Sequence, residues 1–342
     1  MTAPEHGEPP VSPGGRVTIR DVARRAGVSR QTVTRAMNDM SGISEETKER
    51  VLRAAALLDY RPNRAARAMV RGSGTSLGLV IRSLMNPYFP EVAESVIDEA
   101  HARGWSMHLS YIGSNGRDAA EVMRDLAPQV DAVIGYLPPD IGRTGPHFSG
   151  PLVQLDLSGT DSRDAGFRFD LDHDLGLVVD RFVAAGRGRL AMIDGSEDGS
   201  LSVRAPVFTR LATEAGLLAG PDAVALAPES PAGARKALHE LLEQVPSLDG
   251  LFVFNDVMAL GVVHELVRLG VRVPDDLAVI SMDGIQLGEL TSPTLTSVDL
   301  DPRGLARAAV ELVEAILAGD APRHGPGAQH TLRHRLLARE SG

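Results

Sequence analysis

From residue 77 to near the C-terminus, short apolar runs alternate with helical stretches, and this alternation limits the possible folds strongly. An apolar run such as 77–81 is typical of a strand buried on both faces. Alternating strands and helices favour parallel sheets covered by helices on both sides. The number of runs predicts two sheets, with residues 294–299 as a connection that returns to the first. The predicted strands are 77–81, 105–112, 132–137, 152–157, 190–193, 223–226, 251–254, 277–281 and one near 332–338, and the predicted helices are 88–103, 116–126, 174–185, 204–215, 232–244, 256–269 and 302–318.

Residues 18–38, which precede this region, have the pattern of two short helices around a tight turn. Thr18 supplies a hydroxyl N-cap for the first helix, and Gly27 stands where a left-handed C-cap is needed. Ser29 caps the second helix. The pattern is a helix-turn-helix, a motif that places its second helix in the major groove of DNA. The predicted apolar faces are Ile19, Val22, Ala23 and Ala26 on the first helix and Val33, Ala36 and Met37 on the second.

The outward side chains of the second helix fit base recognition. Arg30, Gln31 and Arg35 lie in its first two turns and outside its apolar face. Arg can bind guanine, and Gln adenine, through paired hydrogen bonds, although the spacing alone equally fits solvated residues. A third helix, capped by Ser44, is expected to pack across the other two. Its apolar face is Val51, Ala54, Ala55 and Leu58.

Charge is distributed unevenly along the 342 residues, whose formal net charge is −10. Residues 1–72 contain 13 Lys and Arg and 8 Asp and Glu, whereas the rest of the chain contains 22 basic and 37 acidic side chains. A basic N-terminal part suits phosphate binding, and an acidic remainder should point away from DNA. Charge that served solubility alone would not explain this division.

The sequence also excludes several classes of protein. It has no Cys, and therefore no disulfide framework, thiolate metal site or Cys nucleophile. Residues 1–15 are rich in Pro, Gly and Glu, lack the pattern of a signal peptide, and are expected to be disordered. No apolar stretch of the sequence is long enough to span a bilayer. A cytoplasmic, nucleoid-associated protein without a membrane partner is expected.

The stretch from Thr18 to Asn38 resembles, nearly throughout, the N-terminal motif of the LacI family of bacterial transcription regulators. The main departure is Thr34, where the family usually has Ser, and the hydroxyl is kept. The resemblance continues to the C-terminus. The later matching phrases are Asn86-Pro87-Tyr88-Phe89, residues 252–261, 270–276 and 293–298, and Arg339-Glu340-Ser341-Gly342.

This resemblance implies an all-α helix-turn-helix headpiece and a two-lobed α/β core, similar to periplasmic binding proteins, with parallel sheets. Each lobe is expected to combine segments from separate parts of the chain. The expected parts are a disordered tail at 1–15, a DNA-binding headpiece at 16–60, a hinge helix and linker at 61–75, and an effector-binding and dimerisation core at 76–342, with lobe 1 at about 76–168 and 298–325 and lobe 2 at about 169–297 and 326–342.

The resemblance also assigns residues to DNA. The segment after Pro62 has little to bury and should not be a stable helix alone, but it resembles a hinge that folds when two subunits meet on the operator. Met69 stands where the family usually has Leu, and would enter the minor groove as an apolar wedge. The alternative is that Met69 is a simple linker residue. The expected DNA contacts are Thr18, Ser29, Arg30, Gln31, Thr32, Thr34, Arg35, Asn38, Asn63, Arg67 and Met69.

A ligand site is expected where polar side chains follow the strands of the core, because open α/β sheets bind ligands at the carboxyl ends of their strands. Carboxylates, an amide and an Arg that converge between two lobes suit the neighbouring hydroxyls of a sugar. Taken singly, each of them equally fits a strand-end cap or a turn. Phe89 and Phe208 are candidates for an apolar wall, although either equally fits the core. By resemblance, the effector-binding set is Phe89, Asp156, Arg204, Asn255, Asp256 and Asp283.

No catalytic signature accompanies these features. The sequence has no glycine fingerprint after a strand, no Walker loop, no Gly-x-Ser-x-Gly elbow and no His-Glu-x-x-His. It therefore predicts a ligand-responsive DNA-binding repressor rather than an enzyme, without a cofactor or metal. The expected partners are a palindromic double-stranded operator, a small effector for which a sugar is favoured, and a second copy in a homodimer. A tetramer is not expected, since no C-terminal heptad repeat is present.

Three alternatives stay open. In the first, the DNA role is kept, but the ligand is a co-repressor or the protein activates. The second is a solute-binding sugar receptor, which the missing signal peptide and the basic headpiece disfavour. The third is an α/β enzyme with an accessory DNA domain, which the missing catalytic signatures disfavour.

Overall fold

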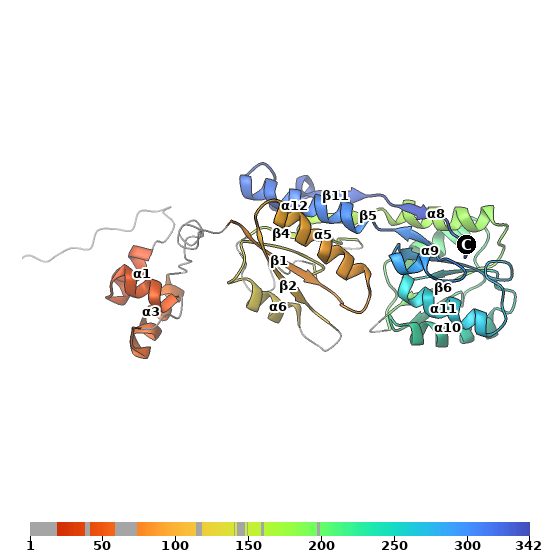
Figure 1. Cartoon of the computed structure of the whole chain (residues 1–342), viewed down its shortest axis with the longest axis horizontal. Coiled ribbons are helices and arrows are strands. Elements are labelled where there is room, and N and C mark those ends of the chain that lie inside the picture. The colour runs from red at the N-terminus through yellow and green to blue at the C-terminus, as the bar shows by residue number, and fades with distance from the viewer. Residues whose placement is uncertain are drawn as a thin grey trace, which may run out of the picture. The chain divides into compact units, whose positions relative to one another are not determined.

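The structure, a computed structural model, divides into two compact units, Met1–Gly74 and Thr75–Gly342 (Figure 1). Each unit is described by itself. The expected tail at 1–15 and the hinge residues 61–73 lie outside the part of the chain that the structure describes. That part comprises residues 19–37, 42–58, 74–113, 118–139, 141, 148, 150–158, 161–196 and 199–342.

In the described part of the first unit, three helices surround a small aliphatic core: α1 (Ile19–Ala26), α2 (Arg30–Met37) and α3 (Glu45–Leu57). Gly27 ends α1 with a φ of 65°, the left-handed conformation that its position requires. Ser29 caps α2, since its Oγ accepts a hydrogen bond from the Thr32 backbone N–H at 3.1 Å. The predicted helix-turn-helix and third helix are therefore confirmed. One valine of each helix is fully buried: Val22, Val33 and Val51.

The first lobe of the second unit is built on a six-stranded parallel sheet in the order β11-β5-β4-β3-β1-β2. Alternate residues of β1, which lies between β3 and the edge strand β2, serve opposite faces. Leu77, Leu79 and Ile81 pack under α5 (Tyr88–Ala102) and α12 (Pro302–Ala318), whereas Val80 packs on α6 (Ala119–Leu126) (Figure 1). The strands are β1 (Ser76–Ile81), β2 (Ser106–Tyr111), β3 (Ala132–Gly135), β4 (Leu152–Gln154), β5 (Ala165–Phe169) and β11 (Gln329–Leu332).

The second lobe has a six-stranded sheet in the order β12-β10-β9-β8-β6-β7, parallel except for the edge strand β12. In Figure 1, α8 and α9 cover one face of this sheet, and α10 and α11 cover the other. The elements are α8 (Leu171–Ala184), β6 (Leu190–Gly195), α9 (Arg204–Glu214), β7 (Val224–Ala227), α10 (Pro231–Gln244), β8 (Gly250–Val253), α11 (Asp256–Arg268), β9 (Ala278–Asp283), β10 (Thr296–Asp299) and β12 (Arg335–Leu337).

The chain passes between the two lobes three times, from β5 to α8, from β10 to α12 and from β11 to β12. Side chains join the three passages. His334 Nδ1 lies 2.7 Å from Asp174 Oδ2, and Arg335 Nη2 donates to Asp299 Oδ2 at 2.9 Å. The three passages therefore form one connected region between the lobes, called here the interlobe region, rather than three independent linkers.

The structure corrects the sequence-based assignment near these passages. Residues 294–299 were expected to connect the lobes, but they contain β10, which pairs with β9 in the second sheet. The single strand expected near 332–338 is two strands, of which β11 (residues 329–332) lies in the first lobe rather than the second. Strand β5 was not predicted at all. These strands lack apolar runs, since Thr296 and Ser297 of β10 are polar yet fully buried.

Close contact between β5 and its neighbour β4 explains why the apolar pattern of β5 is interrupted by a glycine. Gly166 has a φ of 151°, and a Cβ there would lie 2.2 Å from the Gln154 carbonyl oxygen of the neighbouring strand. Only glycine allows the two backbones to approach so closely.

Candidate functional site

The second helix of the first unit presents a polar face. Arg30, Gln31 and Thr34 of α2 are exposed, whereas Arg35 is half-buried. The Thr34 hydroxyl donates to the Arg30 carbonyl oxygen at 3.1 Å. Arg30 and Gln31 are long, exposed and at the N-terminal end of α2, the end that meets base edges when such a helix occupies a major groove.

Two other candidates on this face hold the helix start. Ser29 Oγ lies 2.9 Å from Thr32 Oγ1, and it also caps the helix through the Thr32 backbone N–H. Nearby, the guanidinium of Arg50 on α3 donates from Nε to the Ala26 carbonyl oxygen at 3.1 Å and fixes the end of α1. Five further candidates lie outside the described residues: Thr18, Asn38, Asn63, Arg67 and Met69.

In the second unit, polar and aromatic side chains converge in a cleft between the lobes. The cleft encloses about 400 Å³, part of which is open to solvent. Its residues come from the carboxyl ends of the parallel strands and from the segments that follow them, the position where open α/β sheets bind ligands. The lining residues are Arg82, Asn86, Tyr88, Phe89, Tyr136, Asp156, Phe169, Arg204, Glu229, Phe254, Asn255, Asp283 and Leu300.

The second lobe fixes an amide and a guanidinium in this cleft. Asn255 is the N-cap of α11, and its Oδ1 accepts from the Met258 backbone N–H at 2.9 Å. Its amide nitrogen can therefore serve a ligand as a donor. Arg204 begins α9, donates to the Phe254 carbonyl oxygen, and lies with its Cζ 4.2 Å from the centre of the Phe254 ring. These contacts orient the guanidinium before any ligand arrives.

Two carboxyl groups face the cleft from opposite lobes. Burial raises the pKa of Asp156, although hydrogen bonds from Ser158 and the charge of Arg204 act against this. Burial raises the pKa of Asp283 to about 8, with the negative charge of Asp256 as the next cause. Burial and the nearby charge of Asp256 therefore oppose ionisation of Asp283, and the Asn86 hydrogen bond and the charge of Arg204 offset this only in part.

Polar contacts already cross the cleft. Asn86 Nδ2 of the first lobe donates to Asp283 Oδ2 of the second at 2.9 Å. Arg82 Nη2 lies 3.4 Å from Glu229 Oε1, again one residue from each lobe. The cleft is thus closed by side chains that have hydrogen-bonding groups suited to a polar ligand.

Aromatic side chains of the first lobe form the apolar wall. Tyr88, Phe89 and Tyr136 are buried and meet edge to face, with ring centres 5.2 to 6.4 Å apart. The Tyr88 and Tyr136 hydroxyls lie 2.9 Å apart, and burial raises the pKa of both, so that both stay protonated. A surface of this kind suits the apolar face of a sugar ring.

The cleft contains most of the expected effector residues. Phe89, Asp156, Arg204, Asn255 and Asp283 line it. Asp256 does not, because its carboxylate is fully buried and bonded within the second lobe.

For Phe208, for which both a wall and a core position were open, the structure supports the core. Phe208 is fully buried and stacks on Phe252 at 5.3 Å inside the second lobe. Helical spacing could not separate a core phenylalanine from a wall of the cleft. Eight lining residues were missed. Asn86, Tyr88 and Phe254 belong to phrases already matched to the family, and the others are Arg82, Tyr136, Phe169, Glu229 and Leu300.

Comparison with known proteins identifies the family of the chain. Residues 18–63 match the model of the bacterial regulatory proteins of the lacI family, and residues 179–341 match a periplasmic binding protein-like domain. The ribose operon repressor of Halalkalibacterium halodurans is 32% identical over 82% of this chain and 85% of its own length. The chain belongs to the LacI family. It is therefore a DNA-binding transcriptional regulator and not an enzyme.

Solved structures of LacI-family regulators share the fold. A regulator from Arthrobacter sp. FB24, crystallised with lactose, is 38% identical, with a TM-score of 0.73 over 79% of this chain and 99% of its own. The regulator CelR in complex with cellobiose is 25% identical, with a TM-score of 0.69 over 96% of this chain and 100% of its own. Among the helices that the structure describes, none has the length and apolar character that crossing a bilayer requires.

Proposed function

We propose that this LacI-family regulator is a repressor that acts as a homodimer on a palindromic operator, and that a small sugar bound in the cleft controls its affinity for DNA. The observation that carries the proposal is the cleft itself. It brings three carboxyl groups, two Asn amides and two Arg side chains next to an aromatic wall, between two lobes that can close on a ligand. The regulator acts on the chromosome, in the cytoplasm.

On DNA, α2 occupies the major groove, with Arg30 and Gln31 at base edges and Arg35 behind them. The basic character of residues 1–72 supplies phosphate attraction. Ser29 at the N-cap of α2, and Thr32 and Thr34 within it, contact the DNA backbone or the bases near them. Met69 is the wedge of the hinge in the minor groove. The remaining proposed contacts are Thr18, Asn38, Asn63 and Arg67.

A neutral sugar fits the cleft better than an ion. Two cationic side chains, Arg82 and Arg204, face three acidic ones. One of the cations, Arg82, pairs with the acidic Glu229 across the cleft. A carboxylate or guanidinium can bind two neighbouring hydroxyls at once. The relatives crystallised with lactose and cellobiose support a mono- or disaccharide.

The test of the DNA role begins with selection of a binding sequence from random duplexes. Wild-type protein should select a palindrome, and Arg35→Ala should lose selectivity while keeping salt-dependent binding to any duplex. An Arg→Ala change at Arg53 of α3 is the control, since Arg53 is exposed and paired with Glu49. If wild type selects no sequence, or if Arg35→Ala keeps the selectivity, the assignment of α2 fails.

The test of the effector role is a thermal-shift screen with lactose, cellobiose and simple sugars, repeated with the selected operator. A sugar that lowers operator affinity is an inducer, and one that raises it is a co-repressor. Arg204→Ala should abolish the response without changing DNA affinity. Arg210→Ala is the matched control on the same helix, because Arg210 is exposed and pairs with Asp172. A normal response of Arg204→Ala would refute the site.

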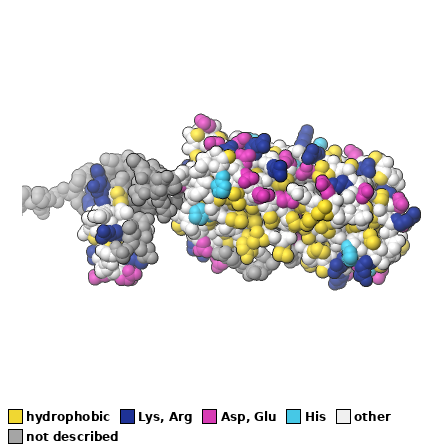
Figure 2. All heavy atoms as spheres, in the orientation of Figure 1, with side chains coloured by type: hydrophobic (Ala, Val, Ile, Leu, Met, Phe, Trp, Pro, Cys, Tyr) yellow, Lys and Arg dark blue, Asp and Glu magenta, His cyan; other side chains and the backbone are white. Residues whose placement is uncertain are grey.

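The proposed dimer has a surface suited to it. Figure 2 shows hydrophobic side chains gathered on one face of the second unit, over both lobes. On the second unit, Met85 is 87% exposed, and an apolar groove runs from it to Leu260 and Leu287. An exposed apolar patch of this extent usually marks an interface, and a homodimer can bury the same patch from both copies.

Sedimentation of Leu287→Glu tests the dimer. The charge should convert a wild-type dimer to monomer, whereas Val183→Glu, on the exposed side of α8, should not. A monomeric wild type, or an unchanged Leu287→Glu dimer, would remove this surface from the interface.

A further inference from the structure

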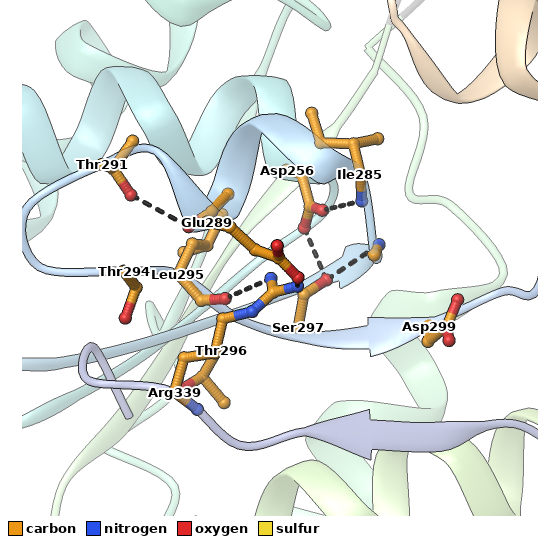
Figure 3. A network of polar contacts seen from close by, with 12 residues as sticks. Asp256, Ile285, Glu289, Thr291, Thr294, Leu295, Thr296, Ser297, Asp299 and Arg339 are labelled. Carbon is orange, nitrogen blue, oxygen red and sulfur yellow. Dashed lines mark hydrogen bonds and ion pairs between the residues drawn. The ribbon is translucent and has the colours of Figure 1, made fainter.

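The carboxylate of Asp256 joins three segments of the second lobe beneath the cleft. Its Oδ1 accepts hydrogen bonds from the hydroxyls of Ser281 on β9 at 2.5 Å and Ser297 on β10 at 2.6 Å. Its Oδ2 accepts from the Ile285 backbone N–H at 2.8 Å. Figure 3 shows the Asp256 side chain pointing toward Ser297 and Ile285. With three donors around it and no exposed surface, this carboxylate has no group free for a ligand.

The turn above this carboxylate contains a residue that lines the cleft. Asp283 has a φ of 136° and Gly284 a φ of 78°, both in the left-handed half of conformational space. The next two backbone N–H groups are held from below: Gly284 donates to Ser297 Oγ at 3.1 Å, and Ile285 donates to Asp256. A strained non-glycine backbone persists only where its surroundings hold it in place.

The backbone of this turn sets the direction of the Asp283 carboxyl. That carboxyl meets Asn86 of the other lobe at 2.9 Å, at the point where the lobes approach each other. A change in the turn would therefore move a ligand-facing group and a contact across the cleft together.

We propose that Asp256 is a positioning residue for the effector site: it touches no effector, but it holds residues 283–285 in the conformation that aims Asp283 into the cleft. The inference rests on the proposed effector site. Asp256 also begins α11, directly after Asn255, so its carboxylate lies where the helix N-terminus favours negative charge.

Replacing Asp256 by Asn tests the role of its oxygens at almost constant volume. An Asn side chain accepts through one oxygen only. If its NH₂ group faces the Ile285 N–H, two donors meet; if it faces the serine hydroxyls, these must rotate to accept, and Ser297 Oγ then serves both this group and the Gly284 N–H. The turn should therefore loosen in Asp256→Asn while the rest of the sheet keeps its contacts.

Hydrogen exchange of the Gly284 and Ile285 amides measures this effect without any ligand. We expect Asp256→Asn to speed their exchange about tenfold or more relative to wild type, as the loss of one buried hydrogen bond implies. Ser341→Ala is the matched control. Ser341 is fully buried and bridges the same two strands, through Val279 O at 2.7 Å and Thr296 N at 2.8 Å, but does not touch the turn.

The link to the effector is tested by a double-mutant cycle with lactose or cellobiose, whichever binds wild type. Asp256→Asn should weaken binding about tenfold or more in the wild-type background, and less than about twofold when Asp283 is already Ala. Equal losses in both backgrounds would show that Asp256 acts elsewhere and overturn the proposal. So would unchanged exchange at the two amides.

The two proposals fail in different ways. If neither sugar binds wild type, the sugar assignment fails, but amide exchange still decides whether Asp256 holds the turn. If Asp256→Asn does not fold, Ser297→Ala provides the second variant. It removes the acceptor of the Gly284 N–H and should speed exchange at that amide, with a smaller loss of sugar affinity.

Discussion

Replacing Asp283 by Asn should stabilise the second unit at neutral pH and weaken effector binding. The folded chain raises the pKa of Asp283 to about 8 from a reference of 3.8, through burial and the charge of Asp256, while Glu229 adds to the shift and Arg204 and Asn86 oppose it. A group whose pKa is raised by folding binds more protons in the folded state. Its contribution to stability is therefore complete below pH 4 and is lost as the pH rises toward 8.

The size of this loss follows from the shift. Each pKa unit corresponds to about 1.4 kcal/mol, so that between pH 4 and pH 7 the Asp283 carboxyl costs up to about 4 kcal/mol relative to a side chain that does not titrate. Asn does not titrate, keeps the shape, can accept the hydrogen bond of Asn86, and tolerates the left-handed backbone. The variant should gain most of that free energy at pH 7 and little at pH 4.

Chemical unfolding of both proteins at several pH values from 4 to 9 measures the effect as a difference between variant and wild type. This difference removes the titrations that the two proteins share. Asp222→Asn is the control, because Asp222 is exposed and the same charge is lost. If the difference between Asp283→Asn and wild type does not change between pH 4 and pH 8, the argument for a buried, protonated carboxyl is wrong.

Three further predictions concern stability. Ser29→Ala removes the cap of α2 and should destabilise the first unit by about 1 kcal/mol, measured by thermal melting of its helices. Gly166→Ala places a Cβ 2.2 Å from the Gln154 carbonyl oxygen and should lower the melting temperature of the second unit by several degrees, whereas Gly176→Ala, which meets nothing within 4 Å, should not. Asp174→Asn weakens the 2.7 Å contact to His334 in the interlobe region, and should lower the free energy of unfolding by about 1–3 kcal/mol. It should also change the rate of lobe closure, measured by fluorescence from dyes on the two lobes.

The alternation of apolar runs and helical stretches was enough to predict two parallel sheets and most of their strands. It failed where burial is achieved with polar residues. Ser297 is fully buried because its hydroxyl bonds to Asp256, and no count of apolar residues could show this. The assignment of β11 and β12 to different sheets depends on pairing with distant strands, β11 with β5 and β12 with β10, which a local pattern does not contain.

The candidate site shows the same limit. Asp156, Asn255 and Asp283 could be predicted as site residues because each follows a parallel strand, and the carboxyl ends of such strands meet at one edge of the sheet. Asp256 and Phe208 looked equally suitable, yet they point into the second lobe, and the direction of a side chain at a helix start is set by packing. Glu229 was missed because its place in the cleft depends on its ion pair with Arg82 of the other lobe.

The three passages between the lobes determine how the second unit responds to limited proteolysis and to truncation. A protease that nicks one exposed loop leaves both halves attached through the other passages, so that the nicked protein should still migrate as one body under native conditions. The same threading means that no single deletion or gene fusion point yields an isolated lobe. A truncation before residue 329 would strip an edge strand from each sheet at once.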